Sequence, residues 1–386
     1  MRKVAGNDTD LQSMGGILSG VEWKSPKYEI VVERGTLCYI RLSVTILSSK
    51  IIKDHGKNMQ NFVHNTFQYS QDESLVVRYL QIEPTNYCNA DCKFCIRKFK
   101  SQEPRHMNIQ ELDALCKHFD QVKYVKLQGL GECFLHPDIG SLVHCLKTHF
   151  PSASVMSSTN LNWSLSDEQL IDNLKELDVL YLSIDGGCQE TYEDLRHGCK
   201  WDVLWRSMKQ LARCKQEGNL FVVSFTASDL NHNEIEDLIS LLYDYPIDEL
   251  RINPVQDWSA DNSLASPERY SNSAYIQTLR SIHEKNIQEP FQVLIAGNEN
   301  FDYSSCIWPF ERMYVDVHGN VFPCVISLSD KWCVGNIYKE KIEDLYQNSF
   351  LKDIRESLTA NKAHRHCRNC SYKALVPIMR KIKTNA

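Results

Sequence analysis

Residues 76–95 read VVRYLQIEPTNYCNADCKFC, an apolar, strand-like run that leads directly into three closely spaced cysteines. Short apolar runs bounded by turn residues are typical of buried strands. Cys88, Cys92 and Cys95 follow the spacing C-x3-C-x2-C, and three thiolates on so compact a loop can hold three corners of a cuboidal iron–sulfur cluster. The fourth iron then has no protein ligand. A zinc knuckle is the alternative, but zinc sites usually show two C-x2-C pairs, or one such pair with two histidines.

The same run opens a regular alternation of short apolar segments and amphipathic segments, which predicts an α/β fold with a parallel sheet. The expected strands are residues 76–83, 124–128, 154–158, 179–184, 220–226 and 249–254. The expected helices between them are residues 109–119, 140–150, 166–174, 201–215 and 233–243. Six strands are too few for a closed eight-stranded barrel, so we expect an open or partial one. Ligands of such folds bind at the carboxyl edge of the sheet, where the three cysteines lie.

The pattern changes at both ends of this unit, which predicts three parts: residues 1–75, 76–290 and 300–386. The first part contains a hairpin-like pair of strands, residues 28–33 and 37–47, that either packs on the barrel or binds a substrate or leader peptide. The second part ends in a helix around residues 274–286. The third part is a small cysteine-bearing domain, with expected strands 313–317 and 321–323 and one expected helix, 342–358.

Composition limits the classes of function. The 386 residues are 42% apolar and 24% charged, as in an ordinary soluble globular protein. The formal charge of −6 argues against nucleic acid as a partner, because nucleic-acid binding usually requires a basic surface. No apolar run approaches the ~20 residues that span a bilayer, and no signal peptide is recognisable, so we expect a cytoplasmic protein without a membrane partner. Fifteen cysteines in such a chain indicate metal binding or catalysis before disulfides.

The cysteine loop after the first strand, with Phe94 before its last cysteine, resembles the signature of the radical S-adenosylmethionine (SAM) superfamily. The resemblance implies a partial (β/α)6 barrel and a [4Fe–4S] cluster on Cys88, Cys92 and Cys95, with SAM chelating the open iron. It also implies reductive cleavage of SAM to a 5′-deoxyadenosyl radical that abstracts a hydrogen atom from substrate. An electron donor such as flavodoxin or ferredoxin is then required. Phe94 is expected to cover the cluster or the adenine ring.

After the second strand, residues 128–133 read QGLGEC and resemble the G-G-E-P element of the superfamily. By this resemblance, Gly129 and Gly131 let the backbone approach the SAM amino group, and Glu132 accepts its charge. Cys133 stands where the superfamily has proline.

Two further elements resemble SAM contacts of the superfamily. Asn160 matches its T-N-G motif, with Leu161 in place of the glycine. Ser183, Asp185 and Arg196 match its S-I-D-G and Y-x-x-x-R-x-G elements. The resemblance implies that Ser183 and Arg196 bind the SAM carboxylate, a task that suits the planar guanidinium fork. Outside this context, Asp185 would be a turn residue and Arg196 a surface residue.

Near the carboxyl terminus, four cysteines supply enough thiolates for a [4Fe–4S] cluster or a tetrahedral zinc: Cys306, Cys324, Cys367 and Cys370. Their layout resembles the SPASM/twitch extension of many radical SAM enzymes. Because no cysteine follows Cys370, the resemblance implies the shortened twitch form with one auxiliary [4Fe–4S] cluster.

The resemblance implies an oxidoreductase or maturase that abstracts hydrogen from a peptide or a natural product such as a sugar or aminocyclitol. Oxidation or crosslinking, aided by the auxiliary cluster, would follow. One alternative is a redox-neutral epimerase, which needs a cysteine hydrogen donor; the candidates are Cys133, Cys188, Cys199 and Cys333. Another is a non-catalytic metal-binding interaction protein, which would not cleave SAM.

Overall fold

The computed structural model describes residues 27–33, 36–43, 77–99, 103–255, 291–296, 306–325, 332–365, 367 and 377–380. The chain divides into two compact units, Met1–Asn65 and Thr66–Ala386. In the first unit, β1 (Lys27–Glu33) and β2 (Thr36–Ser43) pair antiparallel, which confirms the expected hairpin. The helix expected at residues 274–286 lies outside the described residues.

The second unit is built on one 11-stranded sheet with the order β12-β11-β10-β3-β4-β5-β6-β7-β8-β9-β13. Its centre is the six expected strands: β3 (Tyr79–Ile82), β4 (Tyr124–Leu127), β5 (Ser154–Thr159), β6 (Val179–Ser183), β7 (Leu220–Ala227) and β8 (Glu249–Pro254). These six pair in parallel and in chain order. The described strands do not close into a ring, which confirms the partial barrel.

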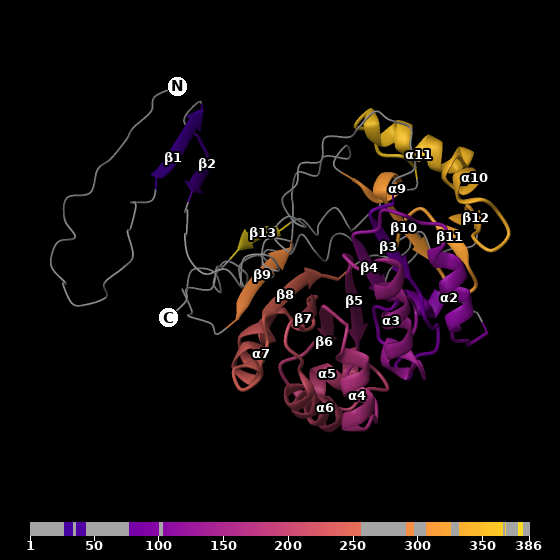
Figure 1. The fold of residues 1–386 in the computed structure, drawn as a ribbon. Helices are drawn as coiled ribbons and strands as arrows, with labels where there is room; N and C mark the ends of the chain where they lie inside the picture. Colours follow the sequence, from indigo (N-terminus) through magenta and orange to yellow (C-terminus); the bar gives the residue numbers. More distant parts are fainter. Residues whose placement is uncertain are drawn as a thin grey trace, which may run out of the picture. The chain divides into compact units, whose positions relative to one another are not determined.

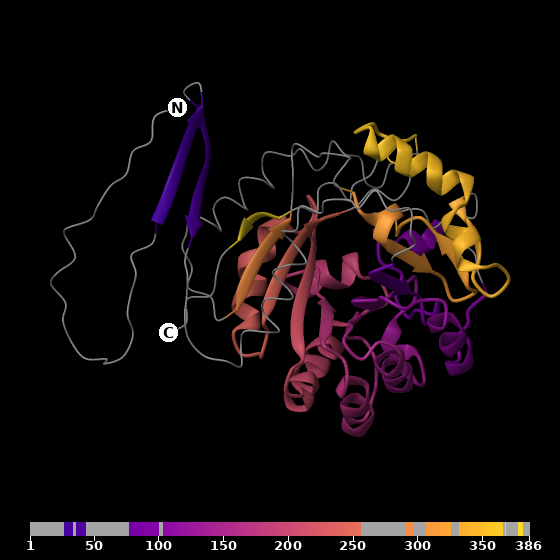
Figure 2. The same cartoon turned by 45° about the horizontal axis from the view of Figure 1, so that its top comes forward.

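Helices follow the central strands and lie along one side of the curved sheet (Figures 1 and 2). They are α2 (Ile109–Cys116), α3 (Ile139–His149), α4 (Asp167–Leu174), α5 (Gln189–Leu195), α6 (Trp201–Cys214) and α7 (Ile235–Leu242), with 3-10 turns η1 (Ile96–Phe99), η2 (Cys133–Leu135) and η3 (His232–Glu234). Capping boxes fix the starts of α2 and α4: the side chains of Asn108 and Ser166 each accept a hydrogen bond from the third helical N–H group. None of the described helices is long and apolar enough to cross a membrane.

Further strands extend the sheet on both sides. Next to β8 lie β9 (Gln292–Ala296), which is parallel to it, and the antiparallel β13 (Pro377–Arg380). Next to β3 lie β10 (Arg312–Val315), parallel to it, then the antiparallel β11 (Asn320–Phe322) and β12 (Gly335–Asn336). The strand pair expected near the carboxyl terminus is therefore present, and it continues the barrel sheet. The boundary of a separate domain at residues 300–386 stays a prediction.

The remaining helices are α9 (Trp308–Glu311), α10 (Ile342–Tyr346) and α11 (Ser349–Thr359). The expectation of one helix over residues 342–358 is wrong, because the helix is interrupted between α10 and α11. Asn348 makes this break: its side-chain oxygen accepts from the Phe350 N–H at 2.9 Å, and its Nδ2 donates to the Val334 carbonyl at 3.0 Å. Asparagine is a preferred residue at such a helix start.

The two faces of the sheet have different chemistry. Leu80, Val125 and Leu182 belong to the hydrophobic core. The opposite face carries polar side chains that meet across strands that are not neighbours: Nζ of Lys126 on β4 lies 4.3 Å from the ring centre of Tyr181 on β6. Because β5 separates these two strands, the contact places both side chains on the concave inner face of the barrel.

Candidate functional site

The cysteine loop (residues 88–95) follows β3 and is held from two sides by backbone hydrogen bonds. On one side, the N–H of Glu132 donates to the Tyr87 carbonyl at 2.9 Å. On the other, the N–H of Asp91 donates to the His197 carbonyl, just beyond α5, at 2.7 Å. The loop therefore lies at the carboxyl edge of the sheet, as the strand order predicts.

The three thiols of the loop are partly buried. Burial raises the pKa of Cys88 to about 11, and it also raises the pKa values of Cys92 and Cys95. Two cations oppose this effect: Arg97 lowers the pKa values of Cys88 and Cys95, and Arg196 those of Cys92 and Cys95. Three thiols beside two guanidinium groups fit a cluster that is bound through thiolates.

Arg97 was not among the expected site residues. Its guanidinium donates to the carbonyls of Ala90 at 2.9 Å and Cys88 at 3.4 Å, and its backbone N–H lies 3.5 Å from the Cys95 sulfur. The sequence offered one signal for this role: a basic residue, Arg97, stands two positions after the last cysteine of the loop.

Glu83, at the end of β3, is a second site residue that sequence analysis missed. Its carboxylate accepts hydrogen bonds from the N–H groups of Leu130 at 2.6 Å and Val317 at 3.3 Å. The Tyr314 hydroxyl donates a third at 3.1 Å. Burial raises the pKa of Glu83 to about 7. A Cβ atom on Gly129 would come within 2.2 Å of the Glu83 side chain, so glycine there makes room for the carboxylate.

Gly131 has a similar function. A Cβ atom at this position would lie 2.3 Å from the carbonyl oxygen of Thr85, where the two chain segments are joined by a backbone hydrogen bond. Both glycines are thus required by close packing within the protein. Their expected approach to the SAM amino group stays a prediction.

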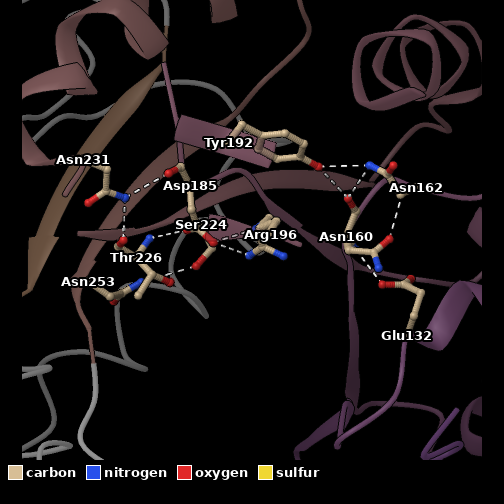
Figure 3. A network of polar contacts seen from close by, with 10 residues as sticks. All are labelled: Glu132, Asn160, Asn162, Asp185, Tyr192, Arg196, Ser224, Thr226, Asn231 and Asn253. Carbon is tan, nitrogen blue, oxygen red and sulfur yellow. Dashed lines mark hydrogen bonds and ion pairs between the residues drawn. The ribbon is translucent and has the colours of Figure 1, made fainter. Parts of the chain in front are cut away.

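Glu132 is almost fully buried and is hydrogen-bonded to Asn160 (Figure 3). Its carboxylate accepts from the N–H groups of Asn160 at 2.6 Å and Phe134 at 3.0 Å. The Asn160 side chain in turn donates to Asn89 of the cysteine loop at 2.8 Å. Burial raises the pKa of Glu132 to about 7, against the opposing effect of these hydrogen bonds. The expected residues Glu132 and Asn160 are therefore brought together beside the cysteine loop.

Leu161, which replaces the motif glycine, is fully buried and has φ of 63°. This is the left-handed region, which glycine adopts freely and which costs other residues roughly 1–2 kcal/mol. The backbone turn of the T-N-G motif is thus retained with a side chain that it disfavours.

Asp185 and Arg196 form a buried ion pair (Figure 3). Nε and Nη2 of Arg196 lie 2.6 and 2.5 Å from the same carboxylate oxygen, and the other oxygen accepts from the Thr226 N–H at 2.6 Å. Asp185 therefore orients Arg196 beside Cys92. Ser183 ends β6, in register with Ser224 of β7. Contacts of these residues with SAM, and of the half-buried Phe94, stay predictions.

The candidate hydrogen donors lie in four different environments. Cys199 is buried, hydrogen-bonded with Tyr192, and electrostatically coupled to Cys88 and Cys92. The Cys133 thiol is completely buried and donates to the Leu127 carbonyl at 3.2 Å. The other two are Cys188, which is exposed at the start of α5, and Cys333, whose thiol donates to the Gly335 carbonyl at 3.3 Å.

The structure describes three of the four expected auxiliary ligands; Cys370 lies outside the described residues. Cys306 precedes α9 and β10, and Cys324 follows β11. Since β10 runs parallel to β3 and β11 antiparallel to β10, both cysteines belong to the amino edge of the sheet. The cysteine loop lies at the opposite, carboxyl edge. Four residues of β3 separate the edges, which is about 13 Å of strand.

Comparison with known families agrees with this geometry. The model described as the radical SAM superfamily matches residues 82–242. These residues form a radical SAM superfamily domain. A second model, the SPASM iron–sulfur cluster-binding domain, matches residues 306–371 and includes all four carboxy-terminal cysteines. The cofactors of this radical SAM protein are accordingly SAM, a cluster at the SAM site and auxiliary iron–sulfur binding in the SPASM part.

Among curated relatives, GTP 3′,8-cyclase of Desulforamulus reducens is 22% identical over 50% of this chain and 61% of its own length. Sporulation killing factor maturation protein SkfB of Bacillus subtilis is 26% identical over 41% of this chain and 38% of its own length. The chain thus spans about half the length of the curated relatives it matches.

Among solved structures, Streptococcus suis SuiB bound to S-adenosylmethionine aligns with a TM-score of 0.60 and 15% identity, covering 78% of this chain and 72% of SuiB. Native anSMEcpe with bound AdoMet aligns with a TM-score of 0.59 and 16% identity, covering 77% and 88%. At these identities, the likeness shows the fold alone.

Proposed function

We propose that this radical SAM protein abstracts a hydrogen atom from an acidic peptide held inside the partial barrel, and that the peptide is oxidised or crosslinked. When bound, SAM and the cluster on the cysteine loop supply a 5′-deoxyadenosyl radical, and a cluster on the four carboxy-terminal cysteines supplies an electron acceptor. The observation that carries the substrate class is the cationic inner face of the barrel.

Among the described residues, the basic side chains of Lys126, Arg251 and Arg312 lie on this inner face, together with the Glu249 carboxylate. Lys126 lies over the Tyr181 ring, and the Arg251 guanidinium donates to the Tyr181 hydroxyl at 3.3 Å. Arg251 also pairs with Glu249 at 2.6 Å. Burial, followed by the charges of Arg251 and Arg312, lowers the pKa of Lys126 to about 7. An anionic group bound on this face would favour the charged form of Lys126 and offset the charges of its basic neighbours.

An acidic peptide fits this face better than the other substrates that the sequence suggests. A cationic aminocyclitol would add to the repulsion among Lys126, Arg251 and Arg312, whereas a peptide carboxylate would restore the charged form of Lys126. Two similar proteins support a peptide substrate: SkfB is named as a maturation protein of the sporulation killing factor, and SuiB has been solved bound to the precursor peptide SuiA. A leader-peptide function of residues 1–75 is consistent with this proposal and needs a separate test.

Each residue near the cysteine loop would have a defined task in this reaction. Glu132 would accept the positive charge of SAM, and Arg196, oriented by Asp185, would hold the SAM carboxylate in a bidentate contact. The clamped cysteine loop would keep water from the reacting atoms. Fixed orientation of this kind supports abstraction at one chosen C–H bond.

Oxidation is favoured over redox-neutral epimerisation by the positions of the cysteines. Two of the four carboxy-terminal cysteines, Cys306 and Cys324, lie at the edge of the sheet opposite the cysteine loop. The four candidate hydrogen donors do not gather at one place on the inner face. Cys133 and Cys199 are buried in contacts within the protein. Cys188 is exposed beside Glu234, and Cys333 lies next to β12.

The first experiment tests SAM cleavage. Anaerobically reconstituted protein with SAM and dithionite should release 5′-deoxyadenosine, and the Cys92→Ala variant should not. If the wild-type protein with a full complement of iron releases none, the non-catalytic interaction protein is the correct interpretation.

The second experiment tests the substrate class with the reconstituted holoprotein and the probe peptide acetyl-(Gly-Glu)3-amide. Isothermal titration should show binding that the matched (Gly-Gln)3 peptide lacks. Lys126→Met should weaken binding by about 2 kcal/mol, or roughly 30-fold. Lys175→Met, which removes a lysine at the end of α4, is the control and should leave affinity unchanged. Equal binding of both peptides, or no effect of Lys126→Met, would contradict an acidic substrate.

A further inference from the structure

A cluster of metal-binding side chains lies between α2 and α3, which pack side by side (Figure 1). Asp113 and Cys116 are three residues apart on α2, and Cys145 and His149 are four residues apart on α3. Residues at these spacings share one face of a helix. Each helix therefore presents a pair of donors toward the other.

The four side chains are in contact. Nε2 of His149 lies 2.9 Å from Oδ1 of Asp113. Asp113, Cys145 and His149 each offer a donor atom, and these atoms all lie within 4.8 Å of one another. The thiols of Cys145 and the buried Cys116 share a hydrogen bond. The donors open into a surface hollow of about 490 Å³.

We propose that Asp113, Cys145 and His149 bind a zinc ion, with Cys116 as the fourth ligand. Cysteine, histidine and aspartate side chains all bind zinc, and structural zinc is four-coordinate. Bonds of about 2.0 Å to nitrogen and oxygen put those atoms about 3.3 Å apart in a tetrahedron, close to the 2.9 Å between Asp113 and His149. Both side chains are partly exposed, so they have room to make the small adjustment.

The charges at this site balance. Two thiolates and one carboxylate carry three negative charges, of which zinc neutralises two. Lys117, at 2.6 Å from the second oxygen of Asp113, offsets the third. The donor set is therefore suited to a dication rather than to a monovalent ion.

This site is separate from the SAM chemistry. Cys116 and His149 end their helices, and helices that follow parallel strands return to the amino edge of the sheet. The cysteine loop lies at the carboxyl edge. A zinc ion here would tie together the helices that flank β4, whose following loop carries Gly129, Gly131 and Glu132. Its role would be structural.

The test uses holoprotein with its iron–sulfur clusters in place, so that the cluster cysteines are occupied. Elemental analysis should find one zinc per chain in addition to iron, and cobalt should produce sulfur-to-cobalt charge-transfer absorption. Cys145→Ser and His149→Ala should each weaken cobalt binding by about ten-fold or more. His144→Ala, which alters an exposed residue of the same helix, is the matched control and should bind normally.

A second readout is independent of absorption. Zinc at a hundred times the wild-type dissociation constant should shift the wild-type folding equilibrium about 100-fold and that of His149→Ala about ten-fold or less, so the melting temperature should rise clearly less for the variant. Unchanged iron content would show that the variants are folded. The proposal is overturned if the wild-type protein binds neither zinc nor cobalt, if Cys145→Ser binds cobalt with the wild-type affinity, or if Cys116 and Cys145 are found joined as a disulfide instead.

Discussion

Glu132 should make the binding of SAM depend on pH. Burial raises its pKa to about 7, so about half of the molecules carry the neutral acid at pH 7 when no ligand is present. Glu132 is expected to accept the positive charge of the SAM amino group, and its carboxyl group must be ionised to do so. Below pH 7, binding therefore releases a proton from Glu132, and SAM affinity falls as the pH falls.

The magnitude follows from this pKa. With a value near 7, roughly one Glu132 in eleven is ionised at pH 6 and ten in eleven at pH 8. The dissociation constant for SAM should therefore be about ten-fold higher at pH 6 than at pH 8, a difference of about 1.4 kcal/mol. The sign is opposite for the stability of the ligand-free fold. A raised carboxyl pKa stabilises folding below the unfolded value of 4.5, and this contribution is lost as pH rises through 7.

The assay is anaerobic equilibrium titration of cluster-loaded protein with SAM at pH 6, 7 and 8. Calorimetry in buffers of different ionisation heat would count the released proton directly. Glu132→Gln keeps the shape of the side chain and removes the charge, so it should bind more weakly and without this pH dependence. A wild-type affinity that is constant from pH 6 to 8, or a Glu132→Gln variant with an unchanged slope, would refute the reasoning.

Two further predictions concern stability. Gly129→Ala should lower the free energy of unfolding in urea by about 3 kcal/mol, because the new Cβ would overlap the Glu83 carboxylate and break its hydrogen bonds. The same substitution in a Glu83→Ala background should lower the free energy of unfolding much less. An equal loss of stability in both backgrounds would contradict this cause. Asp185→Asn should lower unfolding free energy by about 3 kcal/mol and also weaken SAM binding, because it leaves Arg196 buried without its partner. The control is Asp194→Asn, which removes an exposed ion pair and should change neither property.

Local patterns in the sequence were sufficient to predict the barrel. Each of the six central strands is a short apolar run, and the order of these strands placed the cysteine loop at the carboxyl edge. The same reasoning missed α5, because a helix of seven residues with two buried side chains shows little periodicity. It also joined α10 and α11, because the apolar periodicity continues through Asn348 although this residue starts a new helix.

The parts of the site that escaped prediction depend on distant contacts. Glu83 is bound by Tyr314, which lies 231 residues further along the chain, so no local pattern shows why a carboxylate ends β3. At Leu161, the departure from the motif is visible in the sequence, but the left-handed backbone is not. The pairing of Asp185 with Arg196 is similarly invisible, although both residues stood out by resemblance.

The pairing of β10 with β3 has a consequence for how the protein is made. Tyr79 lies beside Arg312 in this ladder, so the first barrel strand stays an open edge until the ribosome has synthesised most of the chain. An open edge can pair with the strand of another molecule. Nascent or truncated chains that end before β10 should therefore aggregate, and they also lack Tyr314, which binds the Glu83 carboxylate. The edge of β3 in a newly made barrel is therefore protected from pairing with other molecules only after the carboxy-terminal region has been synthesised.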